Sequence, residues 1–277
     1  MKKNCSRLFF YSTTLLFLFL VSCEEEKKKM TETDLIFSSI KKDQAKWYRY
    51  HKSNIHLASE FLPLDQTGDT IAKKVFLEAL LTGDFIAMEI KSNTSEDTYR
   101  LFKLDEESDE NIGVTITADT YPEYRHFMME GKEFPDFEFT DLEGKTYSKD
   151  KLKGKTVVVK TWFIACKPCI EEMPQLNQLV EKYRDREDVV FLSLSTDPQQ
   201  DLEKFVTTMD FQYRIVPDTG QFIKEKLGLS VFPTHIIVDE NGVMKKVVNT
   251  APEMISFLES TSIPDLQEDE VPPPPPM

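Results

Sequence analysis

Cysteine is scarce in this sequence, with four residues among 277, and histidine is equally rare. The cysteines are Cys5, Cys23, Cys166 and Cys169. A structural zinc site needs about four ligands, and the body of the chain has no second cysteine pair to complete one around Cys166 and Cys169. The shortage argues against a metal framework and leaves one Cys-x-x-Cys pair, a spacing typical of redox chemistry.

Basic residues are also in short supply, because 34 lysines and arginines face 48 aspartates and glutamates, for a net charge of −14. An acidic surface repels phosphate backbones, so we expect no nucleic-acid partner.

A long apolar run occurs only once, at residues 8–21, and Lys2, Lys3 and Arg7 precede it. The run is interrupted by serine and threonine and is shorter than the roughly 20 residues of a membrane span, so a secretory signal is favoured over an uncleaved anchor. Its end, LVSC at 20–23, resembles the lipobox of bacterial lipoproteins. That resemblance implies that residues 1–22 are removed and that Cys23 is acylated.

Without residues 1–22, 31 basic residues face 48 acidic ones, a net charge of about −17, so membrane attachment rests on lipid. We interpret residues 23–34 as the acylated cysteine and a solvated tether. The triplet at 24–26 is also compatible with an acidic sorting signal for the cell surface. We expect the protein in the cell envelope, on the periplasmic side of a membrane, with the outer membrane or surface left open.

Composition divides the remainder into a small α+β domain at 35–130, a second domain at 131–264 and a proline-rich, disordered tail at 265–277. In the first domain we expect extended chain at 55–64, a helix capped by Asp69 or Thr70 that ends before Gly83, and strands at 86–90 and 98–104. This domain offers no indication of its chemistry. His51, His56 and His126 are interpreted as surface or half-buried residues.

The second domain has the clearer pattern of strands and helices. We expect a hairpin at 134–147, buried strands at 157–163 and 189–195, a helix at 169–184 kinked by Pro174, helices at 201–209, 221–227 and 252–260, and a hairpin of 235–238 with 243–249. The order predicts an α/β sandwich. Cys166 falls at the start of the helix after the first buried strand, where free amide groups favour a thiolate, and Cys169 lies one turn further in.

Several ordered motifs resemble one family. They are FPDF at 134–137, LEGK at 142–145, LKGK at 152–155, WFIACKPC at 162–169, EMP at 172–174, FPT at 232–234 and DENG at 239–242. Together they match thioredoxin-like, membrane-anchored thiol-disulfide oxidoreductases of the TlpA and ResA type, in the AhpC/TSA-Redoxin superfamily. The match covers about residues 131–262 and does not extend to the first domain.

The resemblance implies a thioredoxin fold with a central mixed sheet, flanking helices and an N-terminal β-hairpin. It implies that Pro233 is cis beside the disulfide and that Glu172 is an active-site carboxyl. Cys166 attacks and Cys169 resolves, and no cofactor is expected. The Lys167-Pro168 pair resembles reducing members more than the oxidant DsbA. The implied partners are protein disulfides, a membrane thiol transporter of the DsbD or CcdA kind as electron donor, and the membrane itself through the lipid anchor.

Lys160 departs from the thioredoxin pattern, which has a buried aspartate there. Because 158, 160 and 162 share one face of a strand, we expect a Lys160–Glu172 pair beside Cys169; the alternative is a lysine that reaches solvent at the sheet edge. Ala165 replaces the usual tryptophan. Phe163 stands where a peroxiredoxin needs threonine, so a peroxidase is not expected.

Two other functions remain open at this point. Cys166, Cys169 and His235 together provide ligands for a copper-delivery module of the SCO kind, although that family has a longer cysteine spacing. Alternatively, the first domain is the functional part of a binding lipoprotein that carries a vestigial redox domain. Intact cysteines and Pro233 favour the oxidoreductase.

Overall fold

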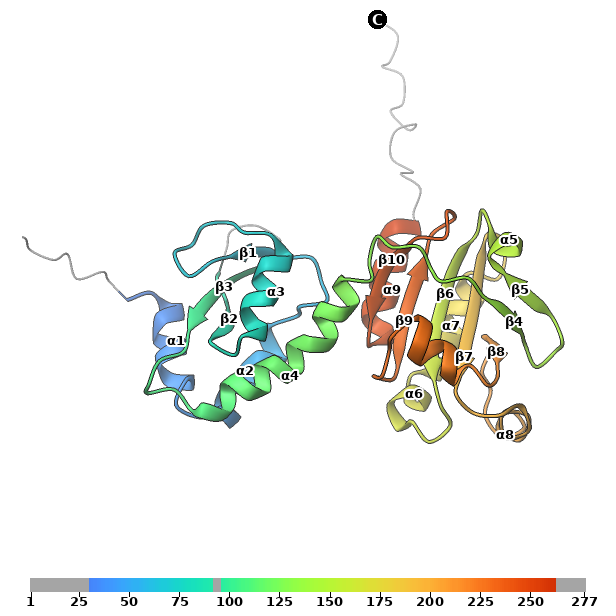
Figure 1. Ribbon diagram of the computed structural model, residues 1–277, viewed down its shortest axis with the longest axis horizontal. Coiled ribbons are helices and arrows are strands. Elements are labelled where there is room, and N and C mark those ends of the chain that lie inside the picture. The colour runs from blue at the N-terminus through green and yellow to red at the C-terminus, as the bar shows by residue number, and fades with distance from the viewer. Residues whose placement is uncertain (1–29, 92–95, 263–277) are drawn as a thin grey trace, which may run out of the picture.

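The computed structural model describes residues 30–91 and 96–262, which form two units joined by a long helix (Figure 1). The predicted signal peptide, Cys23, most of the tether and the tail from residue 265 lie outside the described residues. Within the described ranges, no helix has the length and apolar character needed to cross a membrane.

The N-terminal unit packs four helices around a three-stranded sheet in the order β1-β3-β2. Its elements are α1 Glu32–Ile40, α2 Gln44–Asn54, β1 Leu62–Leu64, α3 Lys73–Leu81, β2 Phe85–Glu89, β3 Thr98–Lys103 and α4 Glu110–Phe127. A separate hydrophobic core that includes Trp47, Phe76 and Ile112 holds the unit together.

The two strands predicted at 86–90 and 98–104 are confirmed as β2 and β3. The extended stretch predicted at 55–64 is wrong for most of its length, because only β1 is a strand. Neither Asp69 nor Thr70 caps α3, whose N-cap is Ala72 without a side-chain hydrogen bond.

Helices α1, α2 and α4 were not predicted. α1 begins at Glu32, so the end of the expected tether is helical. The cause is a capping box: Thr31 Oγ1 accepts from the Asp34 amide at 3.2 Å, and the Thr31 amide donates to Asp34 Oδ2 at 2.8 Å.

The C-terminal unit has a mixed five-stranded sheet in the order β10-β9-β6-β7-β8. Strand β6 pairs in parallel with β7 and antiparallel with β9. The elements are β4 Glu138–Thr140, β5 Thr146–Ser148, α5 Lys149–Leu152, β6 Thr156–Trp162, α6 Lys167–Glu171, α7 Met173–Lys182, β7 Val189–Ser195, α8 Gln199–Phe205, β8 Arg214–Val216, a π-helix at Phe222–Lys226, β9 Thr234–Val238, β10 Met244–Val248 and α9 Ala251–Ser262.

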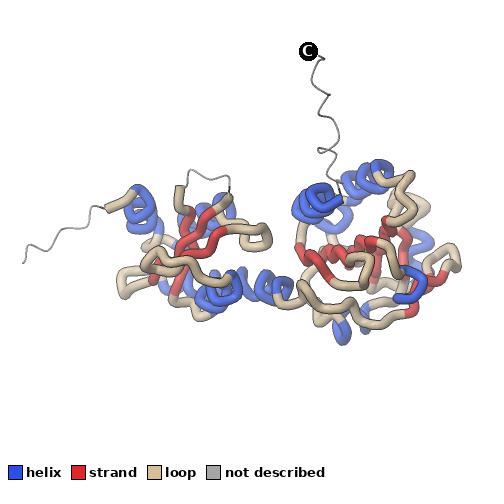
Figure 2. The backbone as a smooth tube through the Cα atoms, turned by 90° about the horizontal axis from the view of Figure 1, so that it is seen from above, coloured by secondary structure: helices blue, strands red, loops and turns tan. Residues whose placement is uncertain are grey.

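Helices cover both sides of this sheet, which runs through the middle of the unit (Figure 2). One core joins the sheet to α7 and α9, and a second joins its other face to the β4–β5 hairpin and the π-helix. This layering is the predicted thioredoxin fold, preceded by an α+β unit.

Alternation along β6 decides where the site residues point. Val157 and Val159 contribute to the core under the hairpin, whereas Val158 and Trp162 belong to the core under α7 and α9. Lys160 has the same parity as Val158, so its side chain enters the α7 and α9 side.

The helix predicted at 169–184 is not one kinked helix. α6 and α7 meet at Glu172, which is the C-cap of the first and the N-cap of the second, and Pro174 lies in the first turn of α7. A proline is tolerated there because the first turn leaves its amides unpaired.

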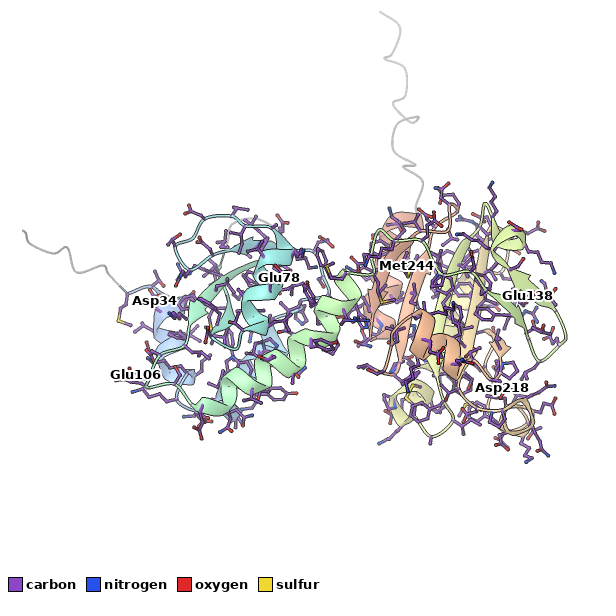
Figure 3. The ribbon with its side chains drawn as sticks, in the orientation of Figure 1. Asp34, Glu78, Glu106, Glu138, Asp218 and Met244 are labelled. Carbon is purple, nitrogen blue, oxygen red and sulfur yellow. A yellow bond between two sulfur atoms is a disulfide. The ribbon has the colours of Figure 1, made fainter. Side chains whose placement is uncertain are left out.

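The two units touch where α4 ends. The Gly131 amide donates to the Met244 carbonyl at 2.8 Å, and Lys246 Nζ lies 3.4 Å from Glu130 Oε1 and 3.5 Å from Glu60 Oε1. Met244 lies on the side of the C-terminal unit nearest to α4 (Figure 3).

Candidate redox site

The Cys-x-x-Cys pair forms a disulfide at the start of α6, just after β6. The S–S bond of Cys166 and Cys169 is 2.03 Å long. Cys166 is the N-cap of α6, as predicted, and its Sγ accepts from the Cys169 amide at 3.3 Å. Cys166 is 5% exposed and Cys169 is 0% exposed, so Cys166 is the cysteine nearer to solvent.

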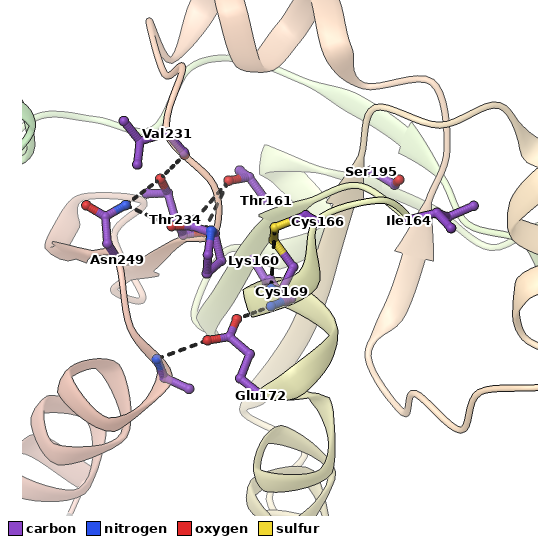
Figure 4. Close-up of a disulfide and its surroundings, with 12 residues drawn as sticks. Lys160, Thr161, Ile164, Cys166, Cys169, Glu172, Ser195, Val231, Thr234 and Asn249 are labelled. Carbon is purple, nitrogen blue, oxygen red and sulfur yellow. Dashed lines mark hydrogen bonds and ion pairs between the residues drawn. A yellow bond between two sulfur atoms is a disulfide. The ribbon is translucent and has the colours of Figure 1, made fainter.

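The loop before β9 supplies the predicted proline. The Phe232–Pro233 peptide bond is cis, and the Pro233 carbonyl accepts from Asn249 Nδ2 at 2.8 Å. Next to it, Thr161 of β6 and Thr234 of β9 face each other in register, and the Thr234 amide donates to Thr161 Oγ1 at 3.2 Å. The pairing fixes this loop beside the end of β6, where the chain turns into the disulfide (Figure 4).

A buried charged cluster lies behind the disulfide. The predicted contact is present: Lys160 Nζ binds Glu172 Oε1. The side chain of Lys160 is 0% exposed and that of Glu172 is 13% exposed, so the alternative of a lysine at the sheet edge is wrong. β6 is the central strand of the sheet, which leaves Lys160 no route to solvent along the sheet.

His235 completes this cluster. It stands opposite Lys160 in the β6–β9 pairing, and its Nε2 lies 2.9 Å from the same oxygen, Glu172 Oε1. The Ala251 amide at the start of α9 donates to the other oxygen, Oε2, at 3.3 Å. We define Lys160, Glu172 and His235 as the buried triad.

Burial and charge pairing act in opposite directions on the pKa of each member of the triad. Burial lowers the pKa of Lys160, although Glu172 raises it, and the result is a lowered pKa. Burial alone would raise the pKa of Glu172, but His235 and Lys160 together hold it below its ordinary value. Burial lowers the pKa of His235 despite the neighbouring carboxylate. The lysine becomes a better acid and the carboxyl stays ionised.

The other histidines lie far from this chemistry. The prediction that His51 and His126 are surface or half-buried residues is wrong, because they are 4% and 2% exposed in the N-terminal unit. Burial lowers the pKa of each to about 4. His56 is exposed, as expected.

Sequence patterns gave no indication that His235 contacts Glu172. The signal that locates it is strand pairing: two positions after the cis proline, the side chain points to the same face as Lys160. Across residues 30–91 and 96–262, no three histidine, cysteine or acidic side chains are grouped to hold a metal ion.

Comparisons with known proteins found similar structures and sequences. A solved thioredoxin domain of a thiol-disulfide oxidoreductase from Bacteroides vulgatus aligns with 47% of this chain and 96% of its own, at 25% identity and a TM-score of 0.43. The AhpC/TSA family model matches residues 131–247.

Two curated relatives are thiol-disulfide oxidoreductases named ResA. The protein from Bacillus thuringiensis (strain Al Hakam) is 36% identical over 139 residues, which are 50% of this chain and 79% of that protein. The one from Geobacillus thermodenitrificans (strain NG80-2) is 31% identical over 153 residues, which are 54% of this chain and 87% of that protein. With its cysteine pair joined as a disulfide in a thioredoxin fold, the chain belongs to the thioredoxin-like thiol-disulfide oxidoreductases of the ResA type.

Proposed function

We propose that this oxidoreductase works as a disulfide reductase, exported from the cytoplasm and held at a membrane by lipid on Cys23. The observation that carries the redox assignment is the asymmetry of the disulfide. Cys166 caps α6 and is the more exposed of the two cysteines, whereas Cys169 is fully buried. A thiolate at a helix start that is accessible at the protein surface can attack a partner, and a fully buried thiol can then complete the exchange.

In the reduced form, the Cys166 thiolate attacks one sulfur of a substrate disulfide. A mixed disulfide forms and the first substrate sulfur leaves as a thiolate. Cys169, after losing its proton, attacks Cys166 Sγ and releases the second substrate sulfur. The substrate gains two electrons and the site becomes the disulfide seen here. Two electrons from a thiol donor restore the reduced form.

The reductive direction rests on Lys167 and Pro168 between the cysteines, where the oxidant DsbA carries a histidine. An oxidising envelope cannot keep such a site reduced, so a membrane thiol transporter of the DsbD or CcdA kind supplies the electrons. The substrates are proteins with disulfides in the cell envelope. Glu172, Lys160 and Pro233 complete the site, with the buried Lys160–Glu172 pair handling the proton of Cys169.

Trapping tests the assignment of the two cysteines. We expect Cys169→Ser to accumulate mixed disulfides through Cys166, because the resolving step is lost. The matched variant Cys166→Ser should accumulate almost none, since its remaining sulfur is buried. A reversed pattern would overturn the roles.

The reduction potential tests the direction. It should lie nearer to that of thioredoxin, about −270 mV, than to that of DsbA, about −120 mV. A value above about −180 mV in a glutathione titration would instead make the protein an oxidase or isomerase.

Copper delivery receives less support. His235 Nε2, the ring nitrogen turned toward the site, is already bound to Glu172 at 2.9 Å. Tight binding of Cu(I) by the reduced protein, lost on His235→Ala, would favour that function over disulfide reduction.

A further inference from the structure

The buried triad brings two basic side chains from two strands onto one carboxylate from a helix junction. Lys160 comes from β6, His235 from β9 and Glu172 from the junction of α6 and α7. The side chains of Lys160 and His235 are each 0% exposed, and their nitrogens contact the same oxygen, Glu172 Oε1. Glu172 is three residues after Cys169, one helical turn away, and Figure 4 shows Lys160 and Glu172 meeting beside that cysteine.

Hydrogen-bond chemistry fixes the proton on His235. A carboxylate oxygen only accepts, so Nε2 must carry the hydrogen that it shares with Glu172. The other nitrogen, Nδ1, is buried and has no hydrogen-bond partner within the described part of the chain. A second proton there would create an unpaired buried cation near the Lys160 ammonium, which is unfavourable. His235 is therefore a neutral, fixed donor.

Glu172 thus receives a donor from each of three directions: Lys160 and His235 on Oε1, and the Ala251 amide on Oε2. Hydrogen bonds to the charged form stabilise the ionised carboxylate. Other titratable groups also face the triad. Burial lowers the pKa of His235, and the charge of Glu253 on α9 acts to raise it. Burial and the charge of Glu172 both raise the pKa of the Tyr213 hydroxyl, which lies just before β8. On β7, the residue paired with Lys160 is Ser193, which does not titrate.

Opening the disulfide places charge in this environment. When a thiolate attacks Cys166, its bond to Cys166 Sγ forms, the Sγ–Sγ bond breaks and the electron pair stays on Cys169. Cys169 is 0% exposed, and a thiolate buried in apolar surroundings is disfavoured. It needs a proton, and an ionised Glu172 has none to give. The Lys160 ammonium carries one.

We propose that His235 is a positioning residue that holds Glu172 ionised, so that Lys160, and not Glu172, exchanges the proton with Cys169. The inference rests on the proposed function in that Cys169 is taken as the buried, resolving sulfur. The proton moves from Lys160 Nζ to Cys169 Sγ, which turns a buried ammonium and thiolate into a neutral amine and thiol. Lys160 then regains a proton from water along the partly exposed edge of Glu172. The resolving step runs in reverse: Lys160 first releases its proton to water, and the neutral amine then takes the proton of Cys169.

Infrared difference spectroscopy of the full protein, reduced minus oxidised, tests the inference. Reduction with dithiothreitol makes the experiment independent of the protein substrate and of the direction of catalysis. We expect no new carbonyl band of a protonated carboxyl group in the wild type. His235→Met should produce such a band, and His235→Gln, its isosteric control that keeps a donor nitrogen, should not. Adding Glu172→Gln to His235→Met should remove the band.

A protonated-carboxyl band that appears in the wild type and is lost in Glu172→Gln would overturn the inference, because Glu172 would then carry the proton. Reduction kinetics give a second measurement if a His235 variant does not fold. Lys160→Met should slow opening of the disulfide by dithiothreitol at pH 7 by roughly 10²-fold, within the range of general acid catalysis. An unchanged rate would also overturn the inference, whereas failure of the trapping experiment would count only against the assigned cysteine roles.

Discussion

Lys160 and Glu172 provide a quantitative test of the buried pair by a double-mutant cycle. Lys160→Met removes the ammonium and leaves Glu172 with two donors, His235 and the Ala251 amide, and with 13% of its side chain exposed. Removing one partner of a fully buried pair costs about 3–5 kcal/mol. Because Glu172 keeps support, we expect the lower end, about 3 kcal/mol of lost unfolding free energy.

The loss of stability caused by Glu172→Gln is limited by a different process, the loss of the proton from Lys160. It leaves the Lys160 ammonium, whose side chain is 0% exposed, without its countercharge. The lysine can escape by losing its proton, which from an ordinary pKa of about 10.4 costs about 4.6 kcal/mol at pH 7 and about 1.9 kcal/mol at pH 9. The unfolded chain then binds more protons than the folded one below that pKa, so stability rises with pH. The deficit of Glu172→Gln should therefore shrink by up to about 2.7 kcal/mol between pH 7 and pH 9.

Urea unfolding of the oxidised protein measures these changes. The sequence has two tryptophans, Trp47 in the N-terminal unit and Trp162 on β6, so a Trp47→Phe background lets Trp162 fluorescence report the C-terminal unit alone. The double variant Lys160→Met with Glu172→Gln should recover most of the loss, with a coupling energy of at least about 2 kcal/mol. Additive losses, with coupling under about 0.5 kcal/mol, or a Glu172→Gln deficit that is flat with pH, would refute the reasoning.

Three further predictions concern other parts of the chain. Mass spectrometry of the mature protein should find Cys23 as an acylated first residue, and an unmodified Cys23 or a retained signal segment would contradict this. Burial lowers the pKa of His51 and His126 to about 4, below the unfolded value of about 6.5. Stability should therefore fall as pH drops through that window, by up to about 3 kcal/mol for each histidine. Changing both histidines to glutamine should flatten this pH dependence in urea titrations at pH 7.5 and pH 5. Burial and the charge of Glu253 raise the pKa of Glu123 to about 7, so stability is lost as pH rises to 7. Glu123→Gln should therefore be more stable than the wild type at pH 8, by on the order of 1 kcal/mol. Equal unfolding midpoints of the two proteins would contradict this prediction.

The C-terminal unit could be predicted from sequence because its signals are local. Each signal predicts a feature at its own place in the chain: the apolar run predicts β6, the glycines predict turns, and the cysteine pair predicts a redox site. The cysteine spacing predicted the redox pair, and strand alternation predicted the Lys160–Glu172 contact, whereas the cis proline was expected only from the resemblance to the family.

Helix α4 shows why the N-terminal unit was harder to predict. It contains β-branched residues, Pro122 and Gly113, all of which weaken a helical pattern. Yet Gly113 has a reason in the packing, since a Cβ there would lie 2.7 Å from the Gly83 carbonyl oxygen. The close contact between α4 and the end of α3 therefore requires glycine at position 113, and the same glycine weakens the helical pattern in the sequence.

The contact of His235 with Glu172 was also not predictable from the sequence. Its own segment, FPTHIIVD at 232–239, predicts a buried strand, in which a histidine is simply one inward-facing side chain. Its chemical meaning depends on which residue stands opposite on β6, and that pairing joins positions 75 residues apart, Lys160 and His235. A lysine and a histidine side by side in a core would repel if both were charged. One carboxylate from the break between α6 and α7 solves this by accepting from both, with the ammonium charged and the imidazole neutral. The break at Glu172 is therefore as much a part of the site as the cysteines, because it turns the Glu172 carboxylate toward both nitrogens.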